Sequence, residues 1–319
     1  MKTFVKGAPK AEKTAEQVAQ EQAPKAVART STSTAKFSQK AAAPDIEFDE
    51  INEDSDYQET LALAIYGPAG AGKTRLACQA PGIVGIVPLN RKTRQTAQTV
   101  SKELGKRMVI PSVDLYKSTN PALASMLQPD CGASAEVNPD LEQPWCCAIH
   151  NSRWSVERTK RVAFSLLDRC DSILIDGFDI FCTDVLSAHF GRTQRIMPRD
   201  REPYNKEIQE FLGALQGKHL ILTMSQKEVW KNDKPTGEFD WSGWPHLSYH
   251  VNCIVRMEIN EKYNPQKDDD WRFALNMVLC QSNPTIIGKS GEKLLTDSAI
   301  TFVGLALQVY PGSDAEKWE

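Results

Sequence analysis

The sequence predicts an α/β fold with a mainly parallel sheet, helices on both faces, and antiparallel strands added at the C-terminal edge. Short continuous apolar runs alternate with helical patterns from residue 60 onward, as in parallel sheets that are buried on both faces. A glycine-rich turn joins the first apolar run to the first helical pattern. Two late apolar segments, 250–259 and 271–280, flank a polar turn and therefore predict an antiparallel pair.

The individual elements follow from apolar periodicity and turn residues. The last helical pattern ends near residue 310, and no internal repeat is visible. Residues 117–150 contain several prolines and predict an irregular insertion. Strands are expected at 61–66, 85–89, 107–113, 172–179 and 219–224, and helices at 73–80, 93–104, 154–169, 203–215 and 297–309.

The ends of the chain differ from this domain in composition. Residues 1–44 contain few large apolar side chains, so they can bury too little surface to offset the entropy of ordering them. Residues 45–59 carry eight acidic and no basic side chains. We therefore divide the chain into a disordered tail with an acidic linker (1–59), a domain (60–310) and a C-terminal tail (311–319). The acidic strip is either a solvated linker or a surface that competes with DNA or docks a partner.

Composition excludes several classes of protein. The net charge of -3 gives no general basic field, so any nucleic-acid site must be local. No run approaches the roughly 20 apolar residues of a membrane span, and the start MKTFVKGAPK does not resemble a signal peptide. The eight cysteines then predict reduced thiols. We expect a cytoplasmic protein with no membrane partner.

The glycine-rich turn, GPAGAGKT at 67–74, matches the phosphate-binding pattern G-x-x-x-x-G-K-[ST] in full. Glycines let backbone N–H groups cradle phosphates, and the helix N-terminus adds partial positive charge. Lys73 would reach the β- and γ-phosphates, and the Thr74 hydroxyl would bind Mg²⁺. The pattern predicts ATP and Mg²⁺ as cofactors. The expected nucleotide contacts are Gly67, Pro68, Ala69, Gly70, Ala71, Gly72, Lys73, Thr74 and Arg75.

Two further polar positions end predicted strands, where ligands bind in folds of this class. Asp176 closes the run SILID about 100 residues after the loop, and we expect it to hold Mg²⁺ through water. Asp179 either positions water or caps the next helix. Gln226 ends the polar cluster of residues 222–226 and could sense the γ-phosphate, although a plain turn would also explain the cluster. The predicted catalytic set is therefore Lys73, Thr74, Asp176, Asp179 and Gln226.

The order of these motifs resembles the RecA-like ATPases of bacteriophages, including the Sak-type single-strand annealing proteins and the phage nucleotide-binding AAA proteins. GPAGAGKT, ILIDGFD, PRDREPYNKEIQEFL and HLILTMSQ occur in that order over about residues 60–285. Asp200, Tyr204 and Asn205 occupy the place of a short family segment before the sensor strand. The resemblance implies a RecA-like fold, ATP hydrolysis, DNA as a partner, and self-association into a ring or filament.

One position departs from the RecA-like pattern. Those enzymes carry a catalytic Glu at the end of the strand that follows the loop helix, whereas the corresponding strand here ends at Asn90. An amide can orient a water molecule but cannot take its proton. Either Asp179 or another acid serves as the base, or hydrolysis is slow.

Two segments are candidates for binding single-stranded DNA. The first, 191–201, is rich in arginine and could bind phosphates, act on a neighbouring subunit's nucleotide, or be a solvated loop. The second, 227–244, mixes lysines with aromatic residues that could stack on bases, or it is a hairpin whose aromatic residues pack on the sheet. Its acidic residues weaken the interpretation as a DNA site. The candidate contacts are Arg192, Arg195, Arg199, Arg201, Lys227, Trp230 and Lys231.

Cys131, Cys146, Cys147 and His150 lie within 20 residues of each other in the predicted insertion. Cysteine and histidine at such distances can bind zinc. Their spacing differs from the usual zinc patterns, and thiols without metal are the preferred interpretation.

Three functions compete on this evidence. The leading expectation is an ATPase acting on single-stranded DNA in recombination, annealing or replication. The second is a nucleotide-gated loader or assembly ATPase, whose N-terminal tail contacts a protein such as a single-strand binding or replication protein. The third is a small-molecule kinase, which would need an acceptor pocket and an arginine-bearing lid. Release of free phosphate would exclude the kinase, and activation by DNA or by protein would separate the other two.

Overall fold

The computed structural model describes residues 60–112, 115, 147–191, 196–267, 270–288 and 293–319. Contacts divide the chain into the units Met1–Tyr57 and Gln58–Glu319, and every described residue belongs to the second. The predictions for residues 1–59, and for most of 117–150, therefore lie outside the described residues.

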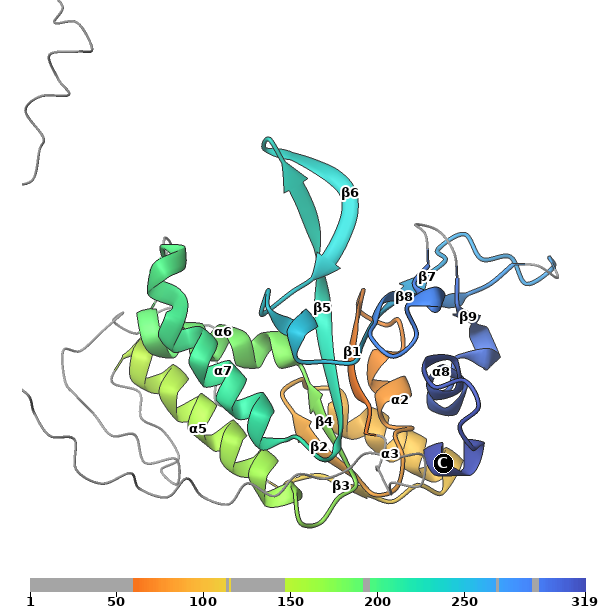
Figure 1. Ribbon diagram of the computed structural model, residues 1–319, viewed down its shortest axis with the longest axis horizontal. Coiled ribbons are helices and arrows are strands. Elements are labelled where there is room, and N and C mark those ends of the chain that lie inside the picture. Colours follow the sequence, from red (N-terminus) through yellow and green to blue (C-terminus); the bar gives the residue numbers. More distant parts are fainter. Residues whose placement is uncertain (1–59, 113–114, 116–146, 192–195, 268–269, 289–292) are drawn as a thin grey trace, which may run out of the picture. The chain divides into compact units, whose positions relative to one another are not determined.

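The described residues form one mixed, mostly parallel sheet with the order β3-β2-β4-β5-β1-β7-β8-β9 (Figure 1). Strand β1 lies between β5 and β7 and is parallel to both, while β8 runs antiparallel to β7. This confirms an α/β fold with antiparallel strands at the C-terminal edge. The strands are β1 (Ala62–Gly67), β2 (Val84–Pro88), β3 (Met108–Val109), β4 (Ser172–Asp176), β5 (His219–Lys231), β6 (Lys234–Trp241), β7 (Cys253–Ile259), β8 (Phe273–Cys280) and β9 (Leu295–Thr296).

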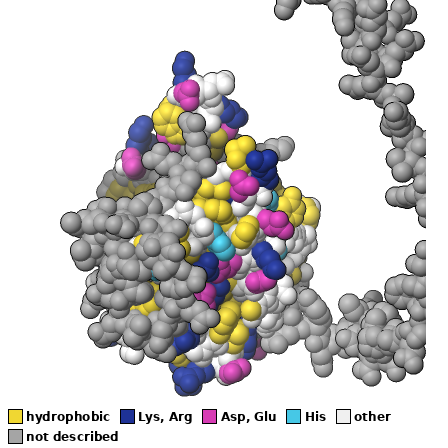
Figure 2. Space-filling view, turned by 90° about the vertical axis from the view of Figure 1, so that its left-hand side faces the viewer, with side chains coloured by type: hydrophobic (Ala, Val, Ile, Leu, Met, Phe, Trp, Pro, Cys, Tyr) yellow, Lys and Arg dark blue, Asp and Glu magenta, His cyan; other side chains and the backbone are white. Residues whose placement is uncertain are grey.

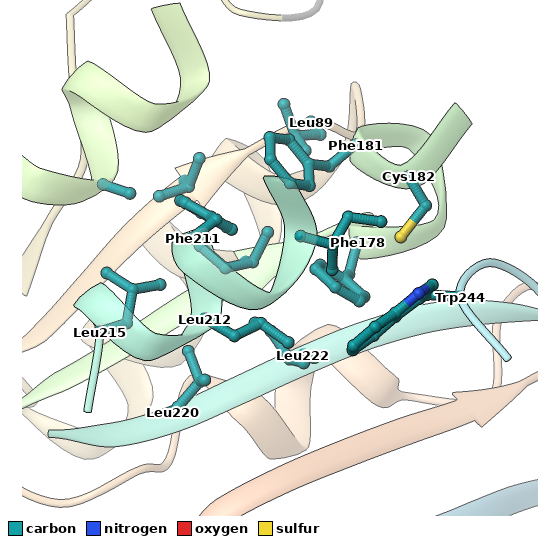
Figure 3. Close-up of a cluster of buried hydrophobic side chains, with 14 of the residues drawn as sticks. Leu89, Phe178, Phe181, Cys182, Phe211, Leu212, Leu215, Leu220, Leu222 and Trp244 are labelled. Atoms are coloured by element: carbon teal, nitrogen blue, oxygen red, sulfur yellow. The ribbon is translucent and has the colours of Figure 1, made fainter. Parts of the chain in front are cut away.

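Helices cover both faces of the sheet, because alternate side chains of each strand enter different hydrophobic clusters. Ala64 and Tyr66 of β1 pack in the cluster beneath α5, α6 and α7. Leu63 and Ile65 pack in the cluster beneath α2, α3 and α8. Figure 3 shows part of the first cluster, where side chains of α6 and α7 surround Leu222 of β5. The helices are α2 (Lys73–Ala77), α3 (Thr93–Leu104), α5 (Ala148–Leu166), α6 (Phe178–Phe190), α7 (Glu202–Ala214) and α8 (Phe302–Val309).

Several boundaries differ from the predicted ones. The strand expected at 172–179 ends at Asp176, because Gly177 adopts a φ of 108° and starts helix α6. Helix α5 begins at Ala148, six residues before the expected start, with the thiol of Cys147 accepting a hydrogen bond from the His150 N–H. Helix α8 begins at Phe302 rather than at residue 297, after a 3₁₀ turn.

The largest difference is strand β5, which was expected to end at residue 224 but continues to Lys231. Its second half pairs with β6 in an antiparallel ribbon that projects from the sheet (Figure 1). At the ribbon's base, the Trp244 indole N–H donates to Asn205 Oδ1 over 2.9 Å, and Trp244 is fully buried. Trp244 is therefore a core residue and not a stacking surface for DNA.

Candidate functional site

The loop between β1 and α2 has the backbone that its glycines were predicted to allow. Gly70 and Gly72 adopt φ values of 85° and 88°, a left-handed conformation that favours glycine. At Gly67 a Cβ atom would lie 2.3 Å from the backbone oxygen of Met257 on β7. Only glycine therefore lets the strand pass this close to its neighbour and turn into the loop.

Lys73 lies inside the loop, at the start of α2. Its ammonium donates hydrogen bonds to the carbonyl oxygens of Gly67 (2.8 Å) and Pro68 (2.7 Å). Burial lowers the pKa of Lys73, and the nearby Asp176 and Asp179 oppose this lowering. An anionic ligand in the loop would favour the charged form further, which suits a phosphate site.

Asp176 lies at the end of β4, is 1% exposed, and has three hydroxyl partners. Its Oδ1 accepts hydrogen bonds from the hydroxyls of Thr74 (3.0 Å) and Thr223 (2.5 Å). Its Oδ2 accepts one from the hydroxyl of Thr93, the first residue of α3. The structure thus brings together Thr74 and Asp176, the two residues predicted to bind magnesium.

The chemistry of this donor set fits Mg²⁺. A carboxylate and hydroxyls are hard oxygen ligands, and Mg²⁺ is usually bound by one or two carboxylates together with water and substrate phosphates. Thr74 and Asp176 would hold the ion. Among the described residues no group of three or more His, Cys, Asp or Glu side chains is placed to bind a metal ion.

These residues line a cavity of about 610 Å³ at the carboxyl ends of β1 and β4 and beside the middle of β5. Such an edge is where ligands bind in open α/β sheets. The cavity is large enough for a small-molecule ligand, for which volumes of roughly 300–1,000 Å³ are typical. It is lined by Ala69, Gly70, Gly72, Lys73, Thr74, Arg75, Asn90, Arg91, Lys92, Thr93, Thr96, Asp176, Asp179, Thr223, Met224 and Ser225.

The remaining predicted catalytic residues divide into two cases. Asp179 lines the cavity, and its Oδ2 accepts a hydrogen bond from the Ser225 N–H over 3.1 Å, which ties α6 to β5. Gln226 is not among the lining residues; it pairs with Trp241 at the base of the ribbon. Thr223, Met224 and Ser225 line the cavity, whereas Gln226 is the first residue of β5 that pairs with β6 in the ribbon. The structure does not support the prediction that Gln226 senses a phosphate.

The segment between β2 and α3 places Asn90 and Thr93 at the cavity. Asn90 lies at the cavity, so the position after β2 contributes an amide there and not a carboxylate. Thr93 was not predicted as a site residue, although its neighbour Asn90 was considered. Three residues separate Thr93 from the end of the predicted strand. Its role as a partner of Asp176 becomes visible only when β2 and β4 are known to be adjacent.

None of the predicted DNA contacts that the structure describes lines this cavity. Arg192 and Arg195 are outside the described residues. Arg199 and Arg201 lie in an exposed 3₁₀ turn, Pro198–Arg201, where Arg199 pairs with Asp200 at 3.6 Å. Lys227, Trp230 and Lys231 lie on the β5–β6 ribbon, and 60% of the Trp230 side chain is exposed.

The proposed zinc ligands are only partly described. Cys131 and Cys146 lie outside the described residues. The thiol of Cys147 and Nδ1 of His150 are 3.3 Å apart and both side chains are buried. Because Cys147 also caps α5, this pair has a structural role at the start of a helix.

No family model and no curated protein sequence matches this chain. Across the part of the chain that the structure describes, no helix combines the length and apolar character needed to cross a membrane.

Proposed function

We propose that this chain is a RecA-like, Mg²⁺-dependent ATPase that acts on single-stranded DNA in recombination, annealing or replication. The observation that carries the proposal is the contact of Thr74 with Asp176 in the cavity that also contains Lys73. These residues come from a loop and a strand far apart in the sequence. Together they supply a phosphate cradle, a cation for the phosphates and oxygen ligands for magnesium.

The chain's own residues suggest how the reaction proceeds. The loop N–H groups and Lys73 bind the β- and γ-phosphates, and bound Mg²⁺ neutralises phosphate charge. Asn90 orients a water molecule through its side-chain amide. Asp179 also lines the cavity, and its described hydrogen bond comes from a backbone N–H and not from the threonines that surround Asp176, so it is the candidate base. Because Asp179 also holds the Ser225 N–H, we expect slow turnover.

The strand order supports an ATPase over a simple nucleotide kinase. Strand β5 lies between β1, which carries the loop, and β4, which carries Asp176. This additional strand separates the two motifs and brings its own polar residues, Thr223 and Ser225, to the cavity. A RecA-like ATPase would use it to sense the nucleotide, and would form a ring or filament with sites between subunits.

The β5–β6 ribbon is the surface that favours single-stranded DNA. It carries the exposed Trp230, which Lys231 follows in sequence, and Lys227 lies three residues before Trp230 on the same strand. Exposed aromatic rings beside cations suit the stacking and phosphate contacts of single strands. Figure 2 shows basic, acidic and hydrophobic side chains mixed at the tip of the molecule, so the site is local.

Asn90 favours one alternative. If no carboxylate activates water efficiently, the bound nucleotide acts as a switch, and the chain is a nucleotide-gated loader or assembly ATPase with a protein partner. The cavity would then be the same, but hydrolysis would be slow and indifferent to DNA.

The test is phosphate release from ATP and Mg²⁺, with and without single-stranded DNA, with Lys73→Ala as the blank. The proposal predicts release that depends on Lys73 and rises with DNA. Release that is slow and unaffected by DNA would support the switch, and release retained in Lys73→Ala would contradict the nucleotide site itself.

A further inference from the structure

A second cavity lies on the other side of the phosphate-binding loop. It has a volume of about 280 Å³ and shares Gly70, Gly72 and Arg75 with the first cavity. Its outer wall comes from the C-terminal part of the domain, which Figure 1 shows beside α2. It is lined by Gly70, Ala71, Gly72, Arg75, Leu76, Gln79, Met257, Phe273, Asp297 and Ile300.

The walls of this cavity are largely apolar. Leu76 and Met257 are buried, and Phe273 and Ile300 are partly buried around them. A Cβ atom on Gly72 would lie 3.6 Å from Cε of Met257, so the loop backbone passes directly against this wall. An apolar slot with few polar groups is typical of sites for flat organic ligands.

Two polar side chains offer hydrogen bonds of opposite kind. Oε1 of Gln79 accepts the Phe302 N–H over 3.2 Å, which leaves the amide NH₂ of Gln79 for a ligand acceptor. The Asp297 carboxylate accepts the N–H groups of Arg272 and Phe273, at 3.0 and 2.9 Å from Oδ1. Each carboxylate has about four acceptor positions, so Asp297 can accept one more bond from a ligand amine.

We propose that this cavity holds the purine base of the nucleotide whose phosphates occupy the first cavity. A purine has apolar faces for Met257, Phe273 and Ile300, and its edge presents a ring acceptor and a donor, which match Gln79 and Asp297. The shared glycines place such a ring on one side of the loop and the phosphates on the other. The inference rests on the proposed nucleotide site and adds the part of the ligand that the loop does not bind.

The C-terminal segment thereby becomes a specificity element. Residues 297–302 are held beside α2 by the hydrogen bond from the Phe302 N–H to Gln79 and by packing of α8 in the hydrophobic cluster. Thr301 caps α8 by accepting the Gly304 N–H, and Ile300 directly precedes this cap. The base contact therefore depends on residues at the far end of the domain sequence.

The test compares ATP, GTP, CTP and UTP with inorganic tripolyphosphate, which carries the phosphates without a base. Dissociation constants are measured by calorimetry with Mg²⁺ for the wild type and for Lys73→Ala, Ile300→Ala, Gln79→Glu and Ile287→Ala. Gln79→Glu keeps the acceptor for Phe302 and removes the amide donor. Ile287→Ala is the matched control, because Ile287 is exposed and is not among the residues that line the cavity.

We expect ATP and GTP to bind about tenfold tighter than tripolyphosphate. The affinities of CTP and UTP should lie between those of the purine nucleotides and that of tripolyphosphate. Ile300→Ala should weaken ATP binding by about fivefold, because the base loses an apolar contact. It should leave tripolyphosphate within twofold of the wild type. Gln79→Glu should lower the ratio of ATP to tripolyphosphate affinity, and Ile287→Ala should change neither.

The outcomes separate the two proposals. Lys73-dependent binding of tripolyphosphate that ATP does not improve would overturn the base pocket and leave the phosphate site standing. A preference for ATP that survives in both Ile300→Ala and Gln79→Glu would also overturn it, since the base would then bind elsewhere. Equal binding of purines and pyrimidines would contradict the purine assignment. If ATP and tripolyphosphate both bind Lys73→Ala as tightly as the wild type, the phosphate site is overturned, and the base pocket with it.

Discussion

Two buried carboxylates have opposite surroundings: Asp176 at the carboxyl end of β4 and Glu207 in the helical layer. Glu207 on α7 is 8% exposed and contacts three basic side chains. Arg153 donates to it at 2.7 Å, Lys160 at 2.5 Å and His189 at 2.6 Å. Asp176 is buried more deeply, and the three hydrogen bonds described for it come from threonine hydroxyls.

This difference is the reason for assigning Glu207 a structural role and for proposing a functional role for Asp176. Arg153 and Lys160 belong to α5 and His189 to α6, so Glu207 joins three helices with charges that the protein itself supplies. Neutral hydroxyls orient Asp176 but do not balance its charge, and the nearby Lys73 ammonium donates its described hydrogen bonds to the carbonyl oxygens of Gly67 and Pro68. A buried anion without full compensation is costly, and a cation from outside would compensate it. We infer that Asp176 is kept for a ligand-borne metal ion.

The largest expected effect is that of Asp176→Asn on turnover. The amide keeps the size of the side chain but cannot hold Mg²⁺ as a carboxylate does, so Mg²⁺-dependent phosphate release should fall by about 100-fold. Thermal unfolding should change little, because Asn retains an acceptor for the threonines. If Asp176→Asn releases phosphate like the wild type across a Mg²⁺ titration, Asp176 is not the carboxylate that holds the ion.

Glu207→Gln should have the reverse effect. Removing this charge leaves Arg153, Lys160 and His189 together, and breaking a buried ion pair costs roughly 3–5 kcal/mol of unfolding free energy. Urea denaturation measures this cost, and phosphate release per folded molecule should be unchanged. The control is Glu210→Gln on the same helix, whose partner Lys206 is exposed and whose loss should cost less than about 1 kcal/mol. A loss of turnover without a loss of stability would contradict the structural role.

The same cluster predicts a pH dependence of stability. Burial alone would raise the pKa of Glu207, but hydrogen bonds from His189, Lys160 and Arg153 lower it from 4.5 to about 2. A carboxyl with a lowered folded-state pKa stabilises the fold above its unfolded pKa and loses this contribution as pH falls toward the folded value. Wild-type stability should therefore drop between about pH 4.5 and 2, by roughly 3 kcal/mol from this group. Glu207→Gln should flatten the drop in urea titrations over that range, and an equal slope in both proteins would be inconsistent with the assignment.

The smallest expected effect is that of Thr93→Val. Valine has nearly the same shape but cannot donate to Asp176, so Mg²⁺ affinity should fall by about tenfold while the nucleotide still binds. The matched control is Thr99→Val on the same helix, where the hydroxyl bonds only to the backbone of Gln95 among the described residues. Equal Mg²⁺ affinities in the two variants would mean that Thr93 does not orient the carboxylate.

Predictions based on local pattern were the most successful. The glycine spacing at 67–74 and the apolar run of β4 located the loop and Asp176, because each signal lies within a few adjacent residues. Helix α3 was predicted with its observed bounds, since its polar face and the glycine after it are visible in the sequence. The antiparallel pair β7–β8 followed from the turn between two apolar runs.

Predictions that depend on strand neighbours were weaker. Thr93 contacts Asp176 only because β2 and β4 pair, and residue spacing does not reveal that pairing. The segment 227–244 was predicted to be either a DNA-binding loop or a hairpin packed on the sheet, and the structure contains the hairpin. Its first strand was not predicted as a continuation of 219–224, because a two-stranded ribbon has no buried face to impose apolar alternation. For Trp244 the sequence left open whether the ring stacks on DNA or packs on the sheet, and the structure places it in the core with a hydrogen bond to Asn205. Glu207 gave no signal, because its three partners, Arg153, Lys160 and His189, come from two other helices.

The most direct test of the central claim is the Mg²⁺ dependence of ATP affinity in the wild type and in Asp176→Asn, measured by calorimetry with Mg²⁺ and with a chelator. If Asp176 is kept for a ligand-borne cation, Mg²⁺ should tighten ATP binding by about tenfold or more in the wild type, and Asp176→Asn should lose most of that gain while binding ATP without metal as before. An equal gain from Mg²⁺ in both proteins would contradict the claim.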